Sequence, residues 1–185
     1  MQQKPRVSLL LVVLLVTPAL AFDKQPKGVG KADFGMSPAQ VEKAYKDKFR
    51  RLDKEHLGAT PVYNPDIVRD LIEDQRLIGL EQPVNIELRF WKDKLWVAIV
   101  YYGKNPNEKV NEALRREYGT PDQTGKDAIW KGDKVMVNSA NAERWYAVSD
   151  VAVSREVQAA FMKDFQQAQQ RAQGQSAPPT PAAGK

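Results

Sequence analysis

The chain has no cysteine, and this constrains its fold strongly because the first residues have the layout of an export signal. Lys4 and Arg6 precede an almost unbroken apolar run over 7–16, and residues 19–21 place alanine at the two positions that a signal peptidase reads. An exported protein without cysteine has no disulfides, so packing alone must stabilise its fold. We therefore expect cleavage after Ala21 and a mature protein that is periplasmic or secreted.

The alternative for this first segment is an uncleaved membrane anchor. The apolar run is shorter than the roughly 20 residues that a spanning helix needs, and Pro18 lies near its end. Because no other segment is apolar enough to cross a bilayer, we expect no integral membrane span after cleavage. There is also no cysteine at the cleavage point to carry a lipid.

The charge of the chain is mildly basic. The formal net charge of +5 includes Lys4 and Arg6, which cleavage would remove. The sequence has no basic stripe of the kind that follows a phosphate backbone, which argues against nucleic acid as a partner.

The length suits one domain with tails. After the signal, residues 22–33 are polar and contain three turn-forming Pro and Gly residues, which predicts a flexible lead-in. Residues 167–185 are rich in Gln and then in Pro and Ala, which predicts a disordered tail. A single α+β domain is expected over 34–166.

Capping residues mark the expected helices. Ser37, Pro38 and Gln40 form a capping box, and the apolar spacing continues as far as Leu52, which predicts a helix that ends before Gly58. The same logic predicts three more helices. The second begins at Asn64-Pro65-Asp66 and ends near Gln75, and the third begins at Asn105-Pro106 and ends at Gly119. The last helix begins at Ser154.

Alternating apolar residues predict the strands. Six strands are expected, over residues 77–80, 84–90, 95–102, 128–131, 134–139 and 145–153. The fold class is α+β, with helices packed on one face of an antiparallel sheet and a helix at the C-terminus.

The two halves of the domain share a short pattern. Val41 and Ala44 of the first helix correspond to Val110 and Ala113 of the third, and each helix is followed by a strand that ends near a Trp-Lys pair. Either the domain is a duplicated helix-plus-hairpin unit, with repeats over 34–103 and 104–153, or a common helix start recurs by chance.

Two motifs carry a resemblance to a known family. Gly35-Met36-Ser37, followed by Val41, resembles the opening of the BamE (SmpA/OmlA) outer-membrane assembly proteins, and Tyr118-Gly119-Thr120-Pro121 resembles the end of that family's helical part. The resemblance implies helices layered on an antiparallel sheet, similar to half of the beta-lactamase-inhibitor-protein fold, and an envelope location. It also implies, by analogy only, a role in outer-membrane protein assembly. The chain lacks the family's lipid-bearing cysteine.

The sequence offers few groups for catalysis. His56 is the only histidine and has no partner at a metal-ligand spacing, so we interpret it as a polar residue near a helix end. Ser139 and Ser149 lack the motif of a nucleophilic serine. We therefore expect no enzyme activity, no metal site and no cofactor.

Aromatic residues are the strongest sign of a contact surface. We expect partner binding through an aromatic sheet face, at residues Trp91, Trp96, Tyr102, Trp130 and Trp145. The hypothesis is an exported, non-enzymatic module of the bacterial cell envelope that binds an envelope or secreted protein. The alternatives are an inhibitor of a secreted enzyme, which inserts a loop such as the 140–143 turn, and a small envelope hydrolase that acts through carboxylates. In the competing interpretation of the aromatics, both sheet faces are buried, the second by the final helix.

Overall fold

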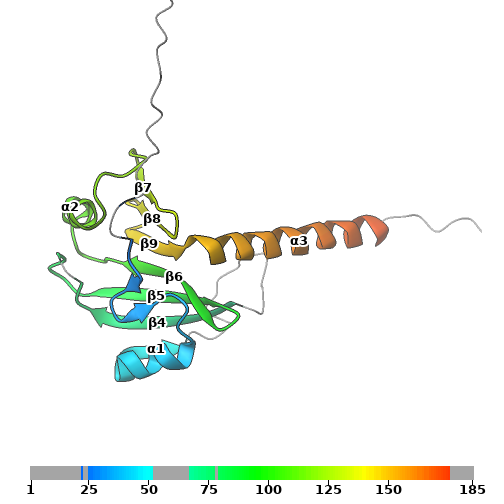
Figure 1. Cartoon of the computed structure of the whole chain (residues 1–185), viewed down its shortest axis with the longest axis horizontal. Coiled ribbons are helices and arrows are strands. Elements are labelled where there is room, and N and C mark those ends of the chain that lie inside the picture. Colours follow the sequence, from blue (N-terminus) through cyan, green and yellow to red (C-terminus); the bar gives the residue numbers. More distant parts are fainter. Residues whose placement is uncertain (1–21, 23–24, 52–66, 78, 176–185) are drawn as a thin grey trace, which may run out of the picture.

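The computed structural model describes residues 22, 25–51, 67–77 and 79–175. One seven-stranded sheet dominates the fold (Figure 1). Its strands are β3 (Phe49–Arg51), β4 (Ile67–Gln75), β5 (Val84–Trp91), β6 (Lys94–Tyr101), β7 (Asp127–Lys131), β8 (Val135–Ala140) and β9 (Trp145–Asp150). The other elements are the hairpin β1 (Gly28–Val29) and β2 (Ala32–Asp33), the helices α1 (Pro38–Tyr45), α2 (Asn107–Tyr118) and α3 (Val151–Gln175), and a 3-10 turn at Lys46–Lys48.

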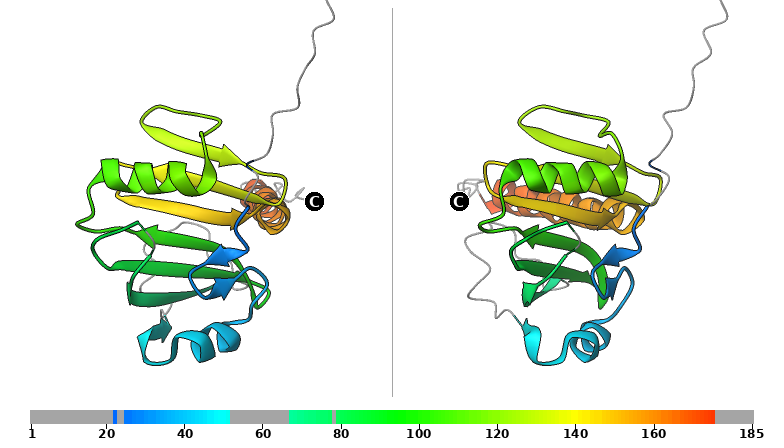
Figure 2. Two further views of the ribbon diagram at one scale, coloured as in Figure 1. Left: turned by 60° about the vertical axis from the view of Figure 1, so that its left-hand side comes forward. Right: turned by 90° about the vertical axis from the view of Figure 1, so that its left-hand side faces the viewer.

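The sheet is antiparallel throughout, with the order β3-β4-β5-β6-β9-β8-β7. Helix α2 and the β1–β2 hairpin lie on one side of it, and α3 projects from the opposite side, as both views in Figure 2 show. The predicted α+β class, with an antiparallel sheet and a C-terminal helix, is confirmed.

The face of the sheet toward α2 is the core face. Ile86 pairs with Val100 and Leu88 pairs with Ala98, and these four side chains are at most 1% exposed. They pack in one cluster with Val110 of α2. This continuous apolar layer is the core that stabilises the fold without disulfides.

The opposite face, which we call the second face, carries the alternate residues of the same strands. Asn85 pairs there with Tyr101, and Arg89 pairs with Val97. The register then shifts, which leaves Trp96 as the extra residue of a β-bulge.

Each half of the chain is a helix followed by antiparallel strands, and the last strands of the two halves, β6 and β9, pair at the centre of the sheet. Val41 of α1 and Val110 of α2, which the sequence pattern matched, are both buried. The two Trp-Lys pairs are not equivalent, however, because Trp91 ends β5 on the second face whereas Trp130 lies on β7 in the core.

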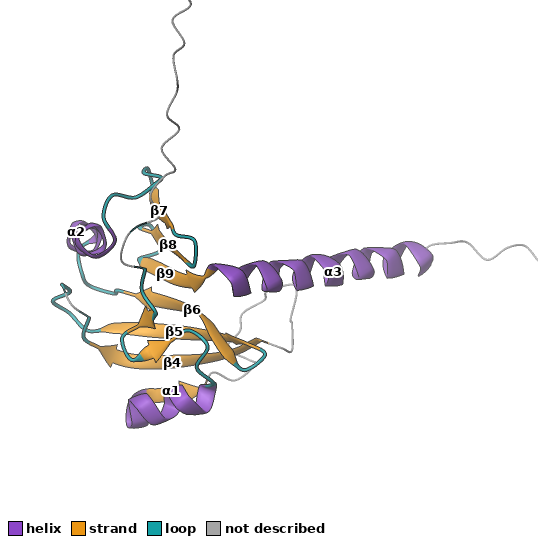
Figure 3. Cartoon of the chain, viewed as in Figure 1, coloured by secondary structure: helices purple, strands orange, loops and turns teal. Residues whose placement is uncertain are grey.

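The helix predicted from 64 to 75 is wrong: residues 67–75 form strand β4 (Figure 3). Its apolar residues fit a helical spacing, but Ile72 pairs with Ile86 and its side chain enters the core face. The first helix is also shorter than predicted, because Phe49 pairs with Ile72 in β3 instead of extending α1. Tertiary pairing outweighs local propensity in both places.

Other boundaries also differ from prediction. Residues 22–33 are not simply a flexible lead-in, since Val29 and Ala32 of the β1–β2 hairpin are buried in the core. Residues 77 and 79–80 are not a strand. Helix α3 begins at Val151, and the Asp150 carboxylate caps it by accepting a hydrogen bond from the Val153 N–H at 2.8 Å. It continues to Gln175, so the first part of the expected tail is helical.

Candidate functional site

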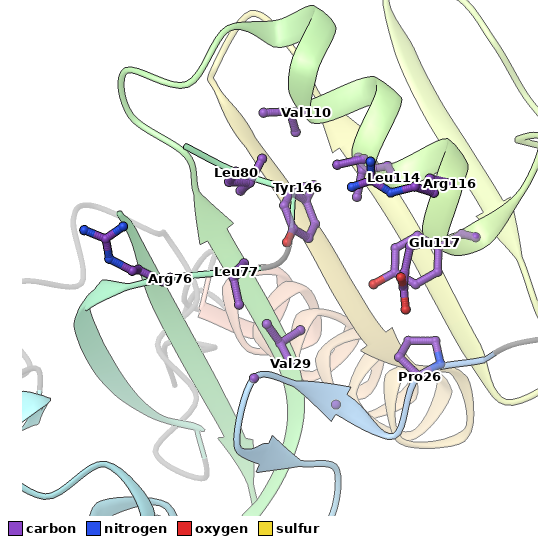
Figure 4. A pocket seen from close by; sticks show the side chains of 14 residues that line it. Pro26, Val29, Arg76, Leu77, Leu80, Val110, Leu114, Arg116, Glu117 and Tyr146 are labelled. Carbon is purple, nitrogen blue, oxygen red and sulfur yellow. The ribbon is translucent and has the colours of Figure 1, made fainter. Parts of the chain in front are cut away.

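A pocket of about 370 Å³ opens on the core-face side of the sheet, between α2 and the β1–β2 hairpin (Figure 4). Its apolar lining comes from segments far apart in the sequence: Val29, Leu77, Leu80, Val110, Leu114 and Tyr146. The volume lies within the range of roughly 300–1,000 Å³ that is usual for ligand sites.

Tyr146 of β9 forms the floor of the pocket. The residue is 7% exposed, and its hydroxyl points into the pocket. Burial raises the pKa of this phenol well above its usual value, and Tyr118 and Glu117 add to the shift. The hydroxyl therefore stays protonated at neutral pH and is free to donate a hydrogen bond to a bound molecule.

Charged side chains border the pocket. Arg76, Arg116 and Glu117 line it, are exposed, and form no ion pair within the described part of the chain. Arg116 lies close to Gly79, where an added Cβ would meet its Nη2 atom. Gly79 has a positive φ of 86°, so its conformation favours glycine.

Hydrogen bonds fix the wall that the N-terminal segment supplies. The Tyr45 hydroxyl accepts a hydrogen bond from the Lys31 N–H at 2.7 Å and donates one to the Val29 carbonyl at 3.3 Å. The side-chain oxygen of Gln25 accepts from the backbone N–H groups of Lys134 and Val135, both at 2.9 Å. The hairpin is thereby held against α1 and the β7–β8 turn, so the pocket is formed before any ligand binds.

Two of the five aromatics predicted to bind a partner are core residues. Tyr102 is fully buried, and its hydroxyl donates to Asn107 Oδ1 at 3.0 Å. Trp130 is 1% exposed, and its indole donates to the Gly119 carbonyl. Neither side chain can take part in an exposed contact surface, so the expectation of an exposed position is wrong for these two.

Of the other three predicted aromatics, Trp91 and Trp145 lie on the second face and Trp96 lies at the β-bulge. Trp91 is only 4% exposed, whereas Trp96 and Trp145 are half-buried. The indole N–H groups of Trp91 and Trp96 have no hydrogen-bond partner among the described residues. Trp145 pairs with Tyr101, which is 36% exposed. The surface available to a partner on this face is therefore narrower than predicted.

Helix α3 carries an apolar stripe that continues beyond the part of the helix that packs on the domain. Val157, Phe161 and Phe165 are spaced four residues apart, so they lie on one side of the helix. Val157 is 4% exposed, Phe161 is half-buried and Phe165 is 50% exposed. Met162 beside them is 53% exposed. The competing interpretation, in which the final helix covers the second face, therefore does not hold for Phe165.

Glu87, a carboxylate that the hydrolase alternative could use, and the turn that the inhibitor alternative invoked both form hydrogen bonds within the fold. Glu87 is buried and accepts hydrogen bonds from Arg89 Nε at 2.8 Å and the Tyr101 hydroxyl at 2.9 Å. The turn after β8 is tied to α2, because Asn107 Nδ2 donates to the Asn141 carbonyl at 3.2 Å.

No protein-family model matches the chain, and no curated protein matches it. Among the described residues no group of His, Cys, Asp and Glu side chains could hold a metal ion, and none of the helices there is long and apolar enough to cross a membrane. His56 and the predicted signal lie outside the described residues.

Sequence reasoning missed the pocket and the exposed stripe of α3. The pocket joins a segment interpreted as a lead-in, a segment interpreted as a strand, and α2, so no local motif marks it. The signal that could have found its floor is the alternation in β9, where Tyr146 and Val148 both point to the core face.

Proposed function

We propose that the chain is an exported, non-catalytic binding module of the bacterial cell envelope, which binds a protein partner through α3 and the second face of the sheet. The apolar stripe of α3 carries this proposal. It begins in the protein's own core at Val157 and continues to Phe165, which no described part of the chain covers. A helix that exposes large apolar side chains in this way is typical of a helix that packs on another protein.

The residues exposed on the second face also support a contact surface on this side of the sheet. The large apolar side chains that are exposed in the described residues are Tyr101, Met162 and Phe165. Tyr101 lies on the second face, and α3 projects from that side of the sheet (Figures 1 and 2). Trp96 is next to Val97, which pairs with Ser149 near the start of α3, whereas Trp145 pairs with Tyr101 at the other end of β9. A partner that extends from α3 along the second face would reach both half-buried tryptophans.

Capture of the partner tests this proposal. The full chain, with a tag at its C-terminus, is cross-linked in the native envelope, and the captured proteins are identified by mass spectrometry. The double variant Met162→Ser/Phe165→Ser should lose the partner that the wild type captures. The matched control, Gln166→Ser/Gln167→Ser, changes exposed polar neighbours on the same helix and should retain it.

The stability of both variants is measured in the same experiment series. Because all four side chains are exposed, the free energy of unfolding of each variant should lie within about 1 kcal/mol of the wild-type value. Capture that is equal in the wild type and the Met162→Ser/Phe165→Ser variant would show that the stripe of α3 is not the contact surface.

A further inference from the structure

The pocket between α2 and the β1–β2 hairpin is a separate feature from the surface proposed for protein binding. It opens on the core-face side of the sheet, whereas α3 projects from the second face (Figure 2). Its walls are held by the hydrogen bonds of Tyr45 and Gln25. A ligand would therefore meet a rigid site and would lose little free energy in ordering it.

The floor of the pocket presents a polar group. The Tyr146 hydroxyl points into the space that Val29, Leu77 and Leu114 surround (Figure 4). Because the hydroxyl faces the pocket, it can donate a hydrogen bond to a molecule that enters. A bound molecule with an oxygen atom near the floor would accept that bond.

The charge at the border of the pocket favours an anion. Arg116 extends from α2 toward the pocket, whereas the guanidinium of Arg76, which also lines it, points away (Figure 4). Glu117 is the one acidic side chain in the lining. A guanidinium presents several N–H donors in a plane, which suits a carboxylate.

We propose that this pocket binds an amphiphilic carboxylate, a small molecule with an apolar chain and one carboxylate group. The apolar chain packs against Val110 and Leu114, and Arg116 together with the Tyr146 hydroxyl binds the oxygen atoms of the carboxylate. The proposed source is a free fatty acid of medium chain length.

Calorimetric titration of the full chain with decanoate tests the proposal. Decylammonium and decanol, which have the same chain length, serve as the cationic and neutral comparisons. Decanoate should bind more tightly than either. Arg116→Gln should weaken decanoate binding about tenfold, since it removes a charge-assisted hydrogen bond. The matched control Arg115→Gln removes the same charge from an exposed neighbour that does not line the pocket. This variant should bind decanoate with the same affinity as the wild type.

Three further variants locate the ligand inside the pocket. Ala113→Phe adds a large side chain to the lining and should abolish binding, whereas Glu112→Phe adds the same side chain to an exposed position outside it and should leave binding unchanged. Tyr146→Phe should weaken the binding of decanoate more than the binding of decanol. Circular dichroism of each variant establishes that it is folded.

Three results would overturn the proposal. Equal affinity for decanoate and decylammonium would show that the pocket does not select an anion. Decanoate binding that survives both Arg116→Gln and Ala113→Phe would place the ligand elsewhere. Binding of an apolar tripeptide with a free C-terminus at least tenfold more tightly than decanoate would make the occupant a peptide end. None of these results bears on partner capture by α3.

Discussion

Trp130 of β7 donates its indole N–H to the backbone carbonyl of Gly119, at a distance of 2.9 Å. Gly119 ends α2, so this bond ties the edge strand of the sheet to the helix that covers it. The ring also packs edge-on against Tyr118, with 6.2 Å between the ring centres. A tryptophan that the sequence placed in a contact surface is thus a structural link.

Trp130→Ala should lower the free energy of unfolding by about 3–5 kcal/mol, because it removes a buried aromatic side chain and leaves a cavity. Urea denaturation measures the change. Trp145→Ala is the control. Because the Trp145 side chain is only half-buried, this substitution should lower the free energy of unfolding clearly less. Equal losses for the two variants would contradict the assignment of Trp130 to the core.

Tyr45→Phe should destabilise the protein by about 1 kcal/mol, since its hydroxyl bonds the backbone at both Val29 and Lys31. Amide exchange in the β1–β2 hairpin should also become faster, because these bonds hold the hairpin against α1. Tyr118→Phe at neutral pH is the control, since the Tyr118 hydroxyl has no hydrogen bond to a described residue. A hairpin whose exchange is unchanged in Tyr45→Phe would show that other contacts hold it.

The sequence predicted the fold class and the centre of the sheet well. The alternation from Val84 to Phe90, the Lys92-Asp93 turn and the apolar run from Leu95 are a clear local signal, and β5 and β6 lie where it placed them. The helix α2 ends at Gly119 as predicted, since glycine adopts the positive φ of 81° there without strain.

The sequence was ambiguous where local and tertiary preferences compete. Leu71 and Ile72 fit either one side of a helix or two faces of a strand, and only the pairing with β5 decides between them. The candidate sites were harder still. Which tryptophans are exposed depends on the bulge at Trp96 and on which face of the sheet α2 covers, and neither can be deduced from residue spacing.

Stability should fall as the pH rises from about 10 to about 12. Burial raises the pKa of Tyr118 to about 12, with a smaller contribution from the Glu117 carboxylate, whereas an unfolded tyrosine titrates near 10. The folded state therefore holds this proton more tightly, so its contribution is complete below the unfolded pKa and is lost as the pH rises through the folded one.

Urea denaturation of the wild type and Tyr118→Phe across this pH range measures that contribution. The fall in the free energy of unfolding should be smaller in the variant, by up to about 3 kcal/mol. Parallel curves for the two proteins would show that the pKa of Tyr118 is not raised by folding.

Arg144→Lys should destabilise the protein by about 2 kcal/mol. Arg144 Nε donates to the Gly103 carbonyl and Nη2 to the Asn105 carbonyl, both at 2.6 Å, and the guanidinium lies over the Tyr102 ring. Lysine retains the charge but cannot reproduce this planar pair of bonds. Thermal unfolding compares Arg144→Lys with the control Arg116→Lys, in which an exposed side chain changes and stability should be nearly unaffected. Equal losses of stability in the two variants would contradict the role of Arg144.

Site-specific photo-cross-linking from α3 in the native envelope tests the central claim most directly. A photoreactive residue is placed at position 165, on the apolar stripe, or at position 167, on another side of the same helix. Binding through the stripe predicts one discrete cross-linked partner from position 165 and little or none from position 167. Equal cross-linking from both positions, or none from position 165, would contradict a contact through α3.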